Sequence, residues 1–156
     1  MQDEHFRVSN KIMADDDNLY PFELIMQATP LSLQSKDNKR RAAWKDFVSE
    51  AARVRQNEVA PMVFLDERPL GATIFYFAPA PMEGDIDNIV KPILDAMNKI
   101  IYPDDRLIER VIVQKFEPGV PRAFEALSEQ LAIALDTAPP VVYLRIDDDL
   151  DWRTVA

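Results

Sequence analysis

The sequence predicts a single α/β domain with a central mixed β-sheet of about four strands flanked by helices. Segments rich in apolar and β-branched residues alternate along the chain with segments whose apolar residues recur at helical spacing. The chain has 156 residues, which suits one domain, and 47% of them are hydrophobic, which is enough for a core. No internal repeat or linker divides the sequence. The predicted order is strand, helix, strand, helix, strand, helix, strand.

The chain divides into three predicted regions. Residues 1–20 are polar and predict an N-terminal arm, whereas residues 148–156 form an acidic C-terminal tail. Residues 21–147 between them form the predicted domain. The first strand is expected at residues 22–28, where apolar residues are dense and Pro30 follows.

The first helix is predicted from Asp37 to about residue 56, with Asp37 or Asn38 as its N-cap. Its expected buried face is an apolar stripe at helical spacing, formed by Ala43, Phe47, Ala51 and Val54 and widened by Trp44 and Val48. Four basic residues surround the start of this helix: Lys36, Lys39, Arg40 and Arg41. Positive charge there opposes the helix dipole, so we consider a solvated turn and contact with phosphates as alternative explanations.

Two further strands and a helix complete the pattern before a final strand. Residues 69–77 predict the second strand, and the prolines of residues 78–81 stiffen the segment after it. Residues 107–116 predict a third strand, buried on both faces because its centre is continuously apolar. A helix is expected at residues 123–135 and the last strand at 141–146.

The segment between the second and third strands carries the residues suited to chemistry. Asp85 and Asp87 precede a helix whose expected buried face contains Ile89, Ile93, Ala96, Met97 and Ile100, and Asp87 or Asn88 is its expected cap. Asp87, Lys91, Asp95 and Asn98 fall together on the opposite face of that helix. Asp104 and Asp105 follow in a turn after Pro103.

Each of these features has an ordinary structural explanation, because aspartates commonly cap helices and form turns and Lys–Asp pairs are common on helix surfaces. Together, however, they place several carboxylates and an ammonium group around one helix. Like charges so close together repel, and a hard divalent cation relieves that repulsion. Mg²⁺ needs few protein oxygens and retains water molecules for chemistry. A magnesium site is therefore the functional hypothesis for this segment.

The motif from Asp85 to Lys91, followed by Leu94-Asp95-Ala96 and then by residues 102–106, resembles the signature of the RusA family of Holliday junction resolvases. The clear resemblance covers about residues 85–115, and a weaker one covers residues 28–34. It implies a RusA-like fold and a Mg²⁺-dependent endonuclease, with Mn²⁺ as a possible substitute, that nicks four-way junctions or other branched DNA symmetrically as a homodimer in recombination and repair. Family members occur in bacteria and often in prophages.

The resemblance also implies roles for individual residues. By position in the motif, Asp85, Asp87 and Asp105 are the catalytic carboxylates that bind metal, and Lys91 is required for activity. We expect Asp95 and Asp104 to support these ligands or to stabilise the helix and the turn. Contact with DNA is expected from the four basic residues Lys36, Lys39, Arg40 and Arg41.

Composition excludes several other classes of function. The chain has no cysteine and one histidine, His5, so thiol chemistry and histidine-based zinc or triad sites are not expected. The N-terminus lacks a signal-peptide pattern and no apolar run is long enough for a membrane span, so we expect a soluble cytoplasmic protein.

The net charge of −9 opposes DNA binding, because phosphate contacts need basic residues. Its distribution reduces the conflict, since residues 36–55 carry +4 and the rest of the chain carries −13. Two alternatives to the nuclease remain. One is a member of the same fold that is catalytically inactive and binds only DNA or protein, which the overall acidity and Glu83-Gly84 before the motif would suit. The other is an aspartyl-phosphate phosphatase, although its motif should follow a strand directly and residues 78–84 intervene here.

Overall fold

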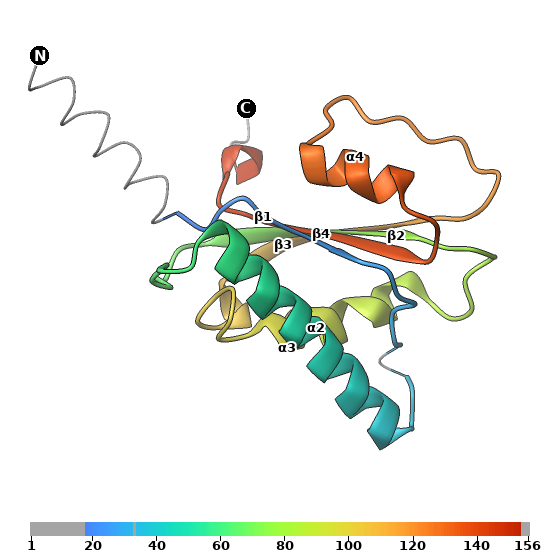
Figure 1. Ribbon diagram of the computed structural model, residues 1–156, viewed down its shortest axis with the longest axis horizontal. Coiled ribbons are helices and arrows are strands. Elements are labelled where there is room, and N and C mark those ends of the chain that lie inside the picture. The colour runs from blue at the N-terminus through green and yellow to red at the C-terminus, as the bar shows by residue number, and fades with distance from the viewer. Residues whose placement is uncertain (1–17, 33, 154–156) are drawn as a thin grey trace, which may run out of the picture.

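The computed structural model describes residues 18–32 and 34–153, which form a four-stranded sheet with helices on both faces (Figure 1). The strands are β1 (Phe22–Met26), β2 (Leu70–Phe77), β3 (Ile108–Phe116) and β4 (Val141–Asp147). The α-helices are α2 (Asn38–Val59), α3 (Val90–Met97) and α4 (Glu129–Asp136). Three short 3₁₀ helices are η1 (Ile86–Ile89), η2 (Asp105–Leu107) and η3 (Asp151–Arg153). The predicted α/β class and element order are thus confirmed.

The sheet is mixed, with strand order β1-β4-β2-β3. β4 pairs antiparallel with both β1 and β2, whereas β2 and β3 pair in parallel. Two parallel neighbours need a crossover connection, and this one contains η1, α3 and η2. The acidic motif lies in that connection, so the chain enters the motif from β2 and leaves it into the neighbouring strand β3.

Helices α2 and α3 cover one face of the sheet and α4 covers the other (Figure 1). Side chains alternate along β2, so Ala72, Ile74 and Tyr76 join the larger core under α2 and α3. Phe77 points to the opposite face and packs in a smaller cluster with Leu131 of α4. Both faces of the central strands are therefore covered, which accounts for their continuously apolar sequences.

The predicted burial of β3 on both faces is wrong. β3 is an edge strand with a single neighbour, and Val111 and Ile112 are exposed. An apolar run of this kind does not distinguish a central strand from an edge strand, because both favour β-branched residues.

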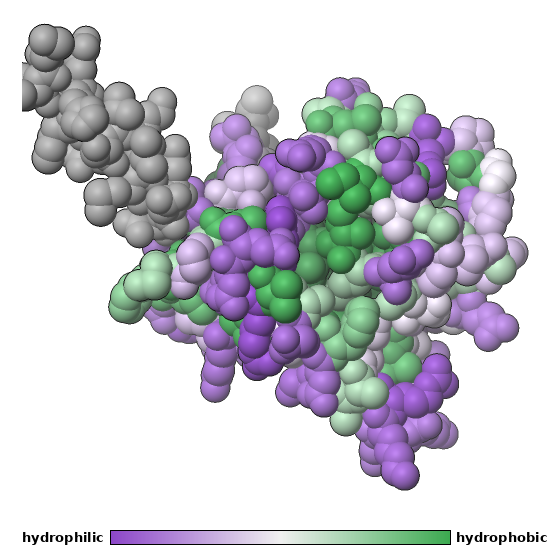
Figure 2. All heavy atoms as spheres, viewed as in Figure 1, coloured by the Kyte–Doolittle hydropathy of each residue, from purple (hydrophilic) through white to green (hydrophobic). Residues whose placement is uncertain are grey.

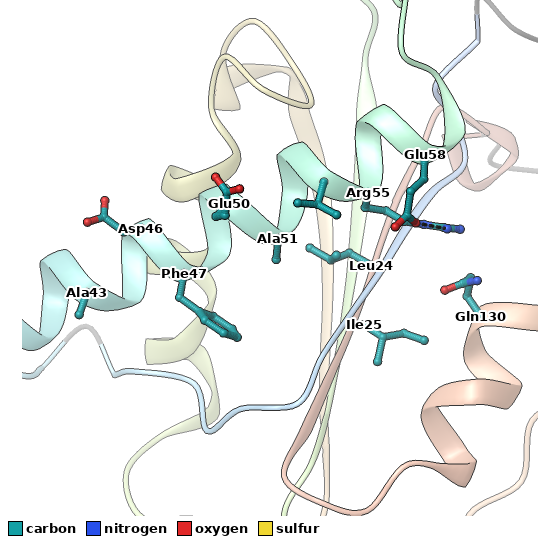
Figure 3. Close-up of a pocket in the computed structure, with 11 residues that line it drawn as sticks. Leu24, Ile25, Ala43, Asp46, Phe47, Glu50, Ala51, Arg55, Glu58 and Gln130 are labelled. Carbon is teal, nitrogen blue, oxygen red and sulfur yellow. Dashed lines mark hydrogen bonds and ion pairs between the residues drawn. The ribbon is translucent and has the colours of Figure 1, made fainter.

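The predicted buried stripe of α2 is rotated from the observed one. Trp44, Val48 and Ala52 face the core, whereas Phe47 is 45% and Val54 is 50% exposed. The outer stripe instead borders a groove of about 740 Å³ between α2, β1 and α4, which lies in the apolar surface between α2 and α4 in Figure 2. Figure 3 shows Phe47 on α2 and Gln130 on α4 at its two sides.

The last helix begins six residues later than the predicted start at Ala123. The Ser128 hydroxyl caps it by accepting a hydrogen bond from the Leu131 N–H at 3.0 Å and donates to the Glu23 carboxylate of β1. Phe124 packs on Phe75 and Phe116 from the preceding loop. The helix therefore begins at the residue after a favourable N-cap, Ser128, and not where the apolar spacing begins.

The two predicted terminal regions extend beyond the described residues. Residues 1–17 and 154–156 lie outside the described residues, so the boundaries at 21 and 147 stay predictions. Within the tail, Asp148 pairs with Arg68 at 2.9 Å, and the Trp152 ring lies 5.4 Å from the Arg110 guanidinium. None of the helices in the described part of the chain has the length and apolar character that a membrane crossing requires.

Candidate functional site

The acidic motif begins where the chain turns after β2. Gly84 has a φ of +81°, a left-handed conformation that favours glycine, and no atom lies near the place of a β-carbon. The preceding segment is held by the Met82 N–H, which donates to the Glu117 carboxylate at 2.6 Å. After this turn, Asp85 has an extended backbone conformation and lies directly before η1.

Asp85 and Asp87 are exposed, and neither side chain forms a capping hydrogen bond to the helix behind it. Asp85 occupies the N-cap position of η1 without a side-chain capping bond, and Ile89, not Asp87 or Asn88, is the N-cap of α3. The predicted cap was therefore wrong. Within residues 18–32 and 34–153, neither carboxylate forms a hydrogen bond or an ion pair. Neither aspartate is therefore explained by a capping hydrogen bond, although Asp87 lies in the first turn of η1, where a negative charge is favourable.

Helix α3 separates an apolar face from a polar one, as predicted for its first two turns. It ends at Met97, however, so the predicted face members Asn98 and Ile100 lie beyond it, and Ile100 is only half-buried. Ile89, Ile93, Ala96 and Met97 are buried beneath it. On the polar face, the Lys91 ammonium lies 3.3 Å from the Asp95 carboxylate, with the Lys91 side chain 62% exposed. An exposed pair of this kind contributes about 0.3–0.5 kcal/mol, so it leaves Lys91 available for other contacts.

A buried tyrosine positions the second half of the motif against the first. The Tyr102 hydroxyl donates to the Leu94 carbonyl of α3 at 2.6 Å, and the Tyr102 carbonyl accepts from the Lys99 N–H at 2.7 Å. Burial raises the pKa of the Tyr102 hydroxyl, and the nearby carboxylates of Asp105 and Asp95 raise it further. Tyr102 therefore ties the turn that carries Asp104 and Asp105 to the end of α3.

The two aspartates of this turn have opposite environments. The Asp104 carboxylate accepts from the Arg106 N–H at 3.0 Å, which caps η2 and lowers the pKa of Asp104. Burial raises the pKa of Asp105, and contact with the carboxyl groups of Asp95 and Asp104 adds to that increase. Asp104 is thus stabilised by its neighbours, whereas Asp105 is crowded by like charge.

The donor chemistry of these residues fits a hard divalent cation. The side chains are all carboxylates, and the raised pKa of Asp105 identifies a place where added positive charge would be favourable. Among the residues that the structure describes, however, no group of three or more His, Cys, Asp or Glu side chains is arranged to hold a metal ion. Asp105 lies beside Asp95 and Asp104.

The basic residues at the start of α2 lie on two sides of the motif. Arg40 lines a cleft of about 570 Å³ with Glu83 and Gly84. Arg41 lines a smaller pocket with Asp95. Lys36 and Lys39 are exposed and line neither hollow. The Lys39 and Arg40 N–H groups donate to the Asp37 side chain, so the expected contribution of free helix N–H groups to phosphate binding is reduced at these two positions.

Two charged residues near the motif, Glu67 and Lys45, were not predicted from the sequence to belong to this region. Glu67 accepts a hydrogen bond from the Arg106 guanidinium at 2.8 Å and so contacts the acidic turn from a distant loop. Lys45 lines the same pocket as Arg41 and Asp95. Helical spacing from Arg41 to Lys45 was a usable signal, but nothing in the sequence paired Glu67 with Arg106.

Comparison with known proteins gives one finding. The family model for the endodeoxyribonuclease RusA matches residues 32–124, which is more than half of the chain and includes the complete acidic motif. None of the curated proteins matches the chain.

Proposed function

Because the chain belongs to the RusA family of endodeoxyribonucleases, we propose that it is a Mg²⁺-dependent enzyme that resolves four-way DNA junctions by symmetric nicks. The observation that carries the proposal is the state of its carboxylates. Asp85 and Asp87 are exposed without a stabilising bond among the described residues, and Asp105 is crowded by neighbouring carboxyl groups. Such residues are poorly explained by stability and well explained by catalysis.

Asp85, Asp87 and Asp105 would hold one or two Mg²⁺ ions, for which Mn²⁺ is expected to substitute. When bound, the metal lowers the pKa of a water molecule and stabilises charge on the attacked phosphate. Asp95 and Asp104 would support this set, Asp95 through its contact with Asp105 and Asp104 through the η2 cap.

Lys91 would contact the phosphate. A charged ammonium group donates hydrogen bonds and does not bind a metal ion, so Lys91 has to act on DNA oxygens or on the carboxylates. Its exposure and its weak pairing with Asp95 favour the phosphate, where it would steady the attacking or the leaving oxygen.

The wider substrate contact would come from the basic residues before and within the first turn of α2. Lys36, Lys39, Arg40 and Arg41 lie in the part of the chain whose charge is positive, and Arg40 and Arg41 border the motif. Two symmetric nicks need two active sites, so a homodimer with a twofold axis fits the reaction. We expect the enzyme to act on DNA in the cytoplasm.

A second candidate is a protein of the same family that binds DNA or a protein partner without cleaving. The net charge of −9 and the Glu83-Gly84 pair directly before the motif favour it, because both weaken phosphate binding close to the site.

Incubation of the purified protein with a synthetic four-way junction, with and without Mg²⁺, separates the two candidates. A linear duplex that contains the sequence of one junction arm is the control substrate. We expect nicking of the junction alone and only with metal. Junction binding without nicking at any concentration of Mg²⁺ or Mn²⁺ would select the second candidate.

A further inference from the structure

A cleft of about 570 Å³ lies directly before the acidic motif, between two anchored segments of the chain. One wall is the loop after β1, where the Ser32 hydroxyl accepts a hydrogen bond from the backbone N–H two residues later at 3.2 Å. The other wall is the proline-rich segment of residues 79–84, which the Met82 N–H anchors to a carboxylate just after β3. This segment ends at the residue before Asp85, so a ligand in the cleft would lie beside the first aspartate of the motif.

An unused hydroxyl group lies on the lining of this cleft. Tyr76, near the end of β2, lines it with only 4% of the residue exposed, and its ring packs in the larger core. Within the described part of the chain, the Tyr76 hydroxyl forms no hydrogen bond. The side-chain polar atoms there that are both sealed from solvent and unbonded belong to Trp44 and Asn98, so the Tyr76 hydroxyl keeps surface that a ligand can reach. A phenol hydroxyl held in this way is a fixed donor and acceptor.

The lining as a whole carries no net charge. Its charged groups are the Arg40 guanidinium in the first turn of α2 and the Glu83 carboxylate, which have opposite signs. Neither side chain forms an ion pair within residues 18–32 and 34–153. A cleft without net charge is poorly suited to a bare phosphate, whereas it suits a neutral group that has hydrogen-bonding edges.

The other side chains of the lining match the surface of a nucleobase. Apolar contacts for a flat ring come from the prolines and Met82, and hydrogen-bonding groups come from Gln34 and Tyr76. The Gln34 side-chain amide is exposed and has no partner among the described residues. An amide donates and accepts at once, which allows it to pair with the edge of a base. The cleft is also within the size range of pockets that hold small ligands.

We propose that this cleft binds one nucleobase of the junction, turned out of the base stack next to the scissile phosphate. Turning a base out costs least where it is already poorly stacked or paired, and the crossover of a four-way junction is such a place. The Gln34 amide and the Tyr76 hydroxyl would bond the edge of the base, and Arg40 would hold the phosphate of the same nucleotide. The inference rests on the proposed nuclease function and adds Gln34 and Tyr76 to the residues that contact the substrate.

Junctions that carry the fluorescent base 2-aminopurine provide a direct test. The analogue would be placed in turn at each position flanking the crossover, and each junction would be titrated with the full chain in EDTA, so that no strand is cut. The anisotropy of a dye on a distant arm reports binding in the same samples. We expect a saturable, severalfold rise in 2-aminopurine fluorescence at one position and its symmetry equivalent, because a base that leaves the stack is no longer quenched by its neighbours.

Variants of the lining test which residues hold the base. An abasic site at the responsive position should weaken junction binding about tenfold, the loss expected for one bound base. Tyr76→Phe and Gln34→Ala should each reduce that penalty, whereas the matched control Gln130→Ala, on α4 at the other face of the sheet, should leave it unchanged. The Tyr76 hydroxyl has no bond to lose in the described structure, so Tyr76→Phe should keep the native melting temperature.

Several results would overturn the assignment of the cleft to a base. A bound junction without a fluorescence rise at any position refutes it, and an equal rise at all positions means that the protein opens the junction without a base site. An abasic penalty that is unchanged in both Tyr76→Phe and Gln34→Ala means that the base lies elsewhere. These readouts need no cleavage. Nicking in Mg²⁺ without a fluorescence rise refutes the cleft alone, and a rise at one position without nicking refutes the nuclease alone.

Discussion

Replacement of Asp105 by asparagine is expected to stabilise the protein at neutral pH. A carboxyl group whose pKa is raised by folding favours the folded state only when protonated, so ionised Asp105 costs stability. Burial is the first cause of that cost, and the like-charge neighbours Asp95 and Asp104 add to it. At about 0.2–1 kcal/mol for each exposed charge contact, the variant should gain about 1 kcal/mol, or roughly 2–4 °C in melting temperature. An amide also keeps the shape of the side chain and can donate to Asp95.

The dependence on pH tests the physical cause. The gain should be largest at about pH 7 and should disappear as the pH falls below the ordinary carboxyl pKa of about 3.9, where Asp105 is protonated in both states. Asp104→Ala is the control with the opposite sign, because Asp104 caps η2 and its pKa is lowered. Its removal should lower the melting temperature at neutral pH. A lower melting temperature for Asp105→Asn at neutral pH, or a gain that persists unchanged in acid, would refute the reasoning.

Three further predictions address the ligands, the basic cluster and the turn. Lys91→Ala should slow cleavage but leave the Mn²⁺ affinity, measured by calorimetric titration, equal or higher, whereas Asp105→Asn should weaken Mn²⁺ binding. If Lys91→Ala weakens Mn²⁺ binding as much as Asp105→Asn does, Lys91 holds the carboxylates in place and does not contact the phosphate. Changing the whole basic cluster to glutamine should flatten the plot of log K for junction binding against log salt by about 0.9 per lost contact, and an unchanged slope would place the DNA surface elsewhere. Tyr102→Phe should cost about 1–3 kcal/mol in urea unfolding, because the Leu94 carbonyl would lose its buried donor; an unchanged midpoint would show that water replaces the hydroxyl.

The sequence predicted the fold class because local signals agreed with tertiary structure at most elements. Asp37 caps α2 as expected, since the capping bond is local and the residue has a strong preference for that position. The buried face of α3 was also predicted, because a helix that packs on one side leaves a clear apolar spacing.

The errors occurred where residues outside a segment determine which of its side chains are buried. α2 has apolar residues on more than one face, so spacing alone did not select Trp44 and Val48 over Phe47 and Val54 as the buried set. For β3, strand order makes it an edge, and strand order is not encoded in the strand's own composition.

The sequence supplied the candidate residues of the site but not their arrangement. The motif named Asp85, Asp87, Lys91 and Asp105, and the resemblance supplied their roles, which stay predictions. The structure adds that Asp105 contacts Asp95 through the Tyr102 turn, which no spacing rule gives because the contact crosses two elements. Glu67 was likewise unpredictable, since it reaches Arg106 from a loop 39 residues earlier.

The central claim is that the motif carboxylates carry out metal-dependent cleavage, and one measurement tests it most directly. The native protein, Asp85→Asn and the control Asp136→Asn, an exposed aspartate of α4, would each be incubated with a labelled four-way junction and Mg²⁺. Asp85 has no bond to lose in the described structure, so the variant should fold normally. The account predicts paired nicks at symmetric positions for the native protein and the control, and none for Asp85→Asn. Undiminished nicking by Asp85→Asn would contradict it.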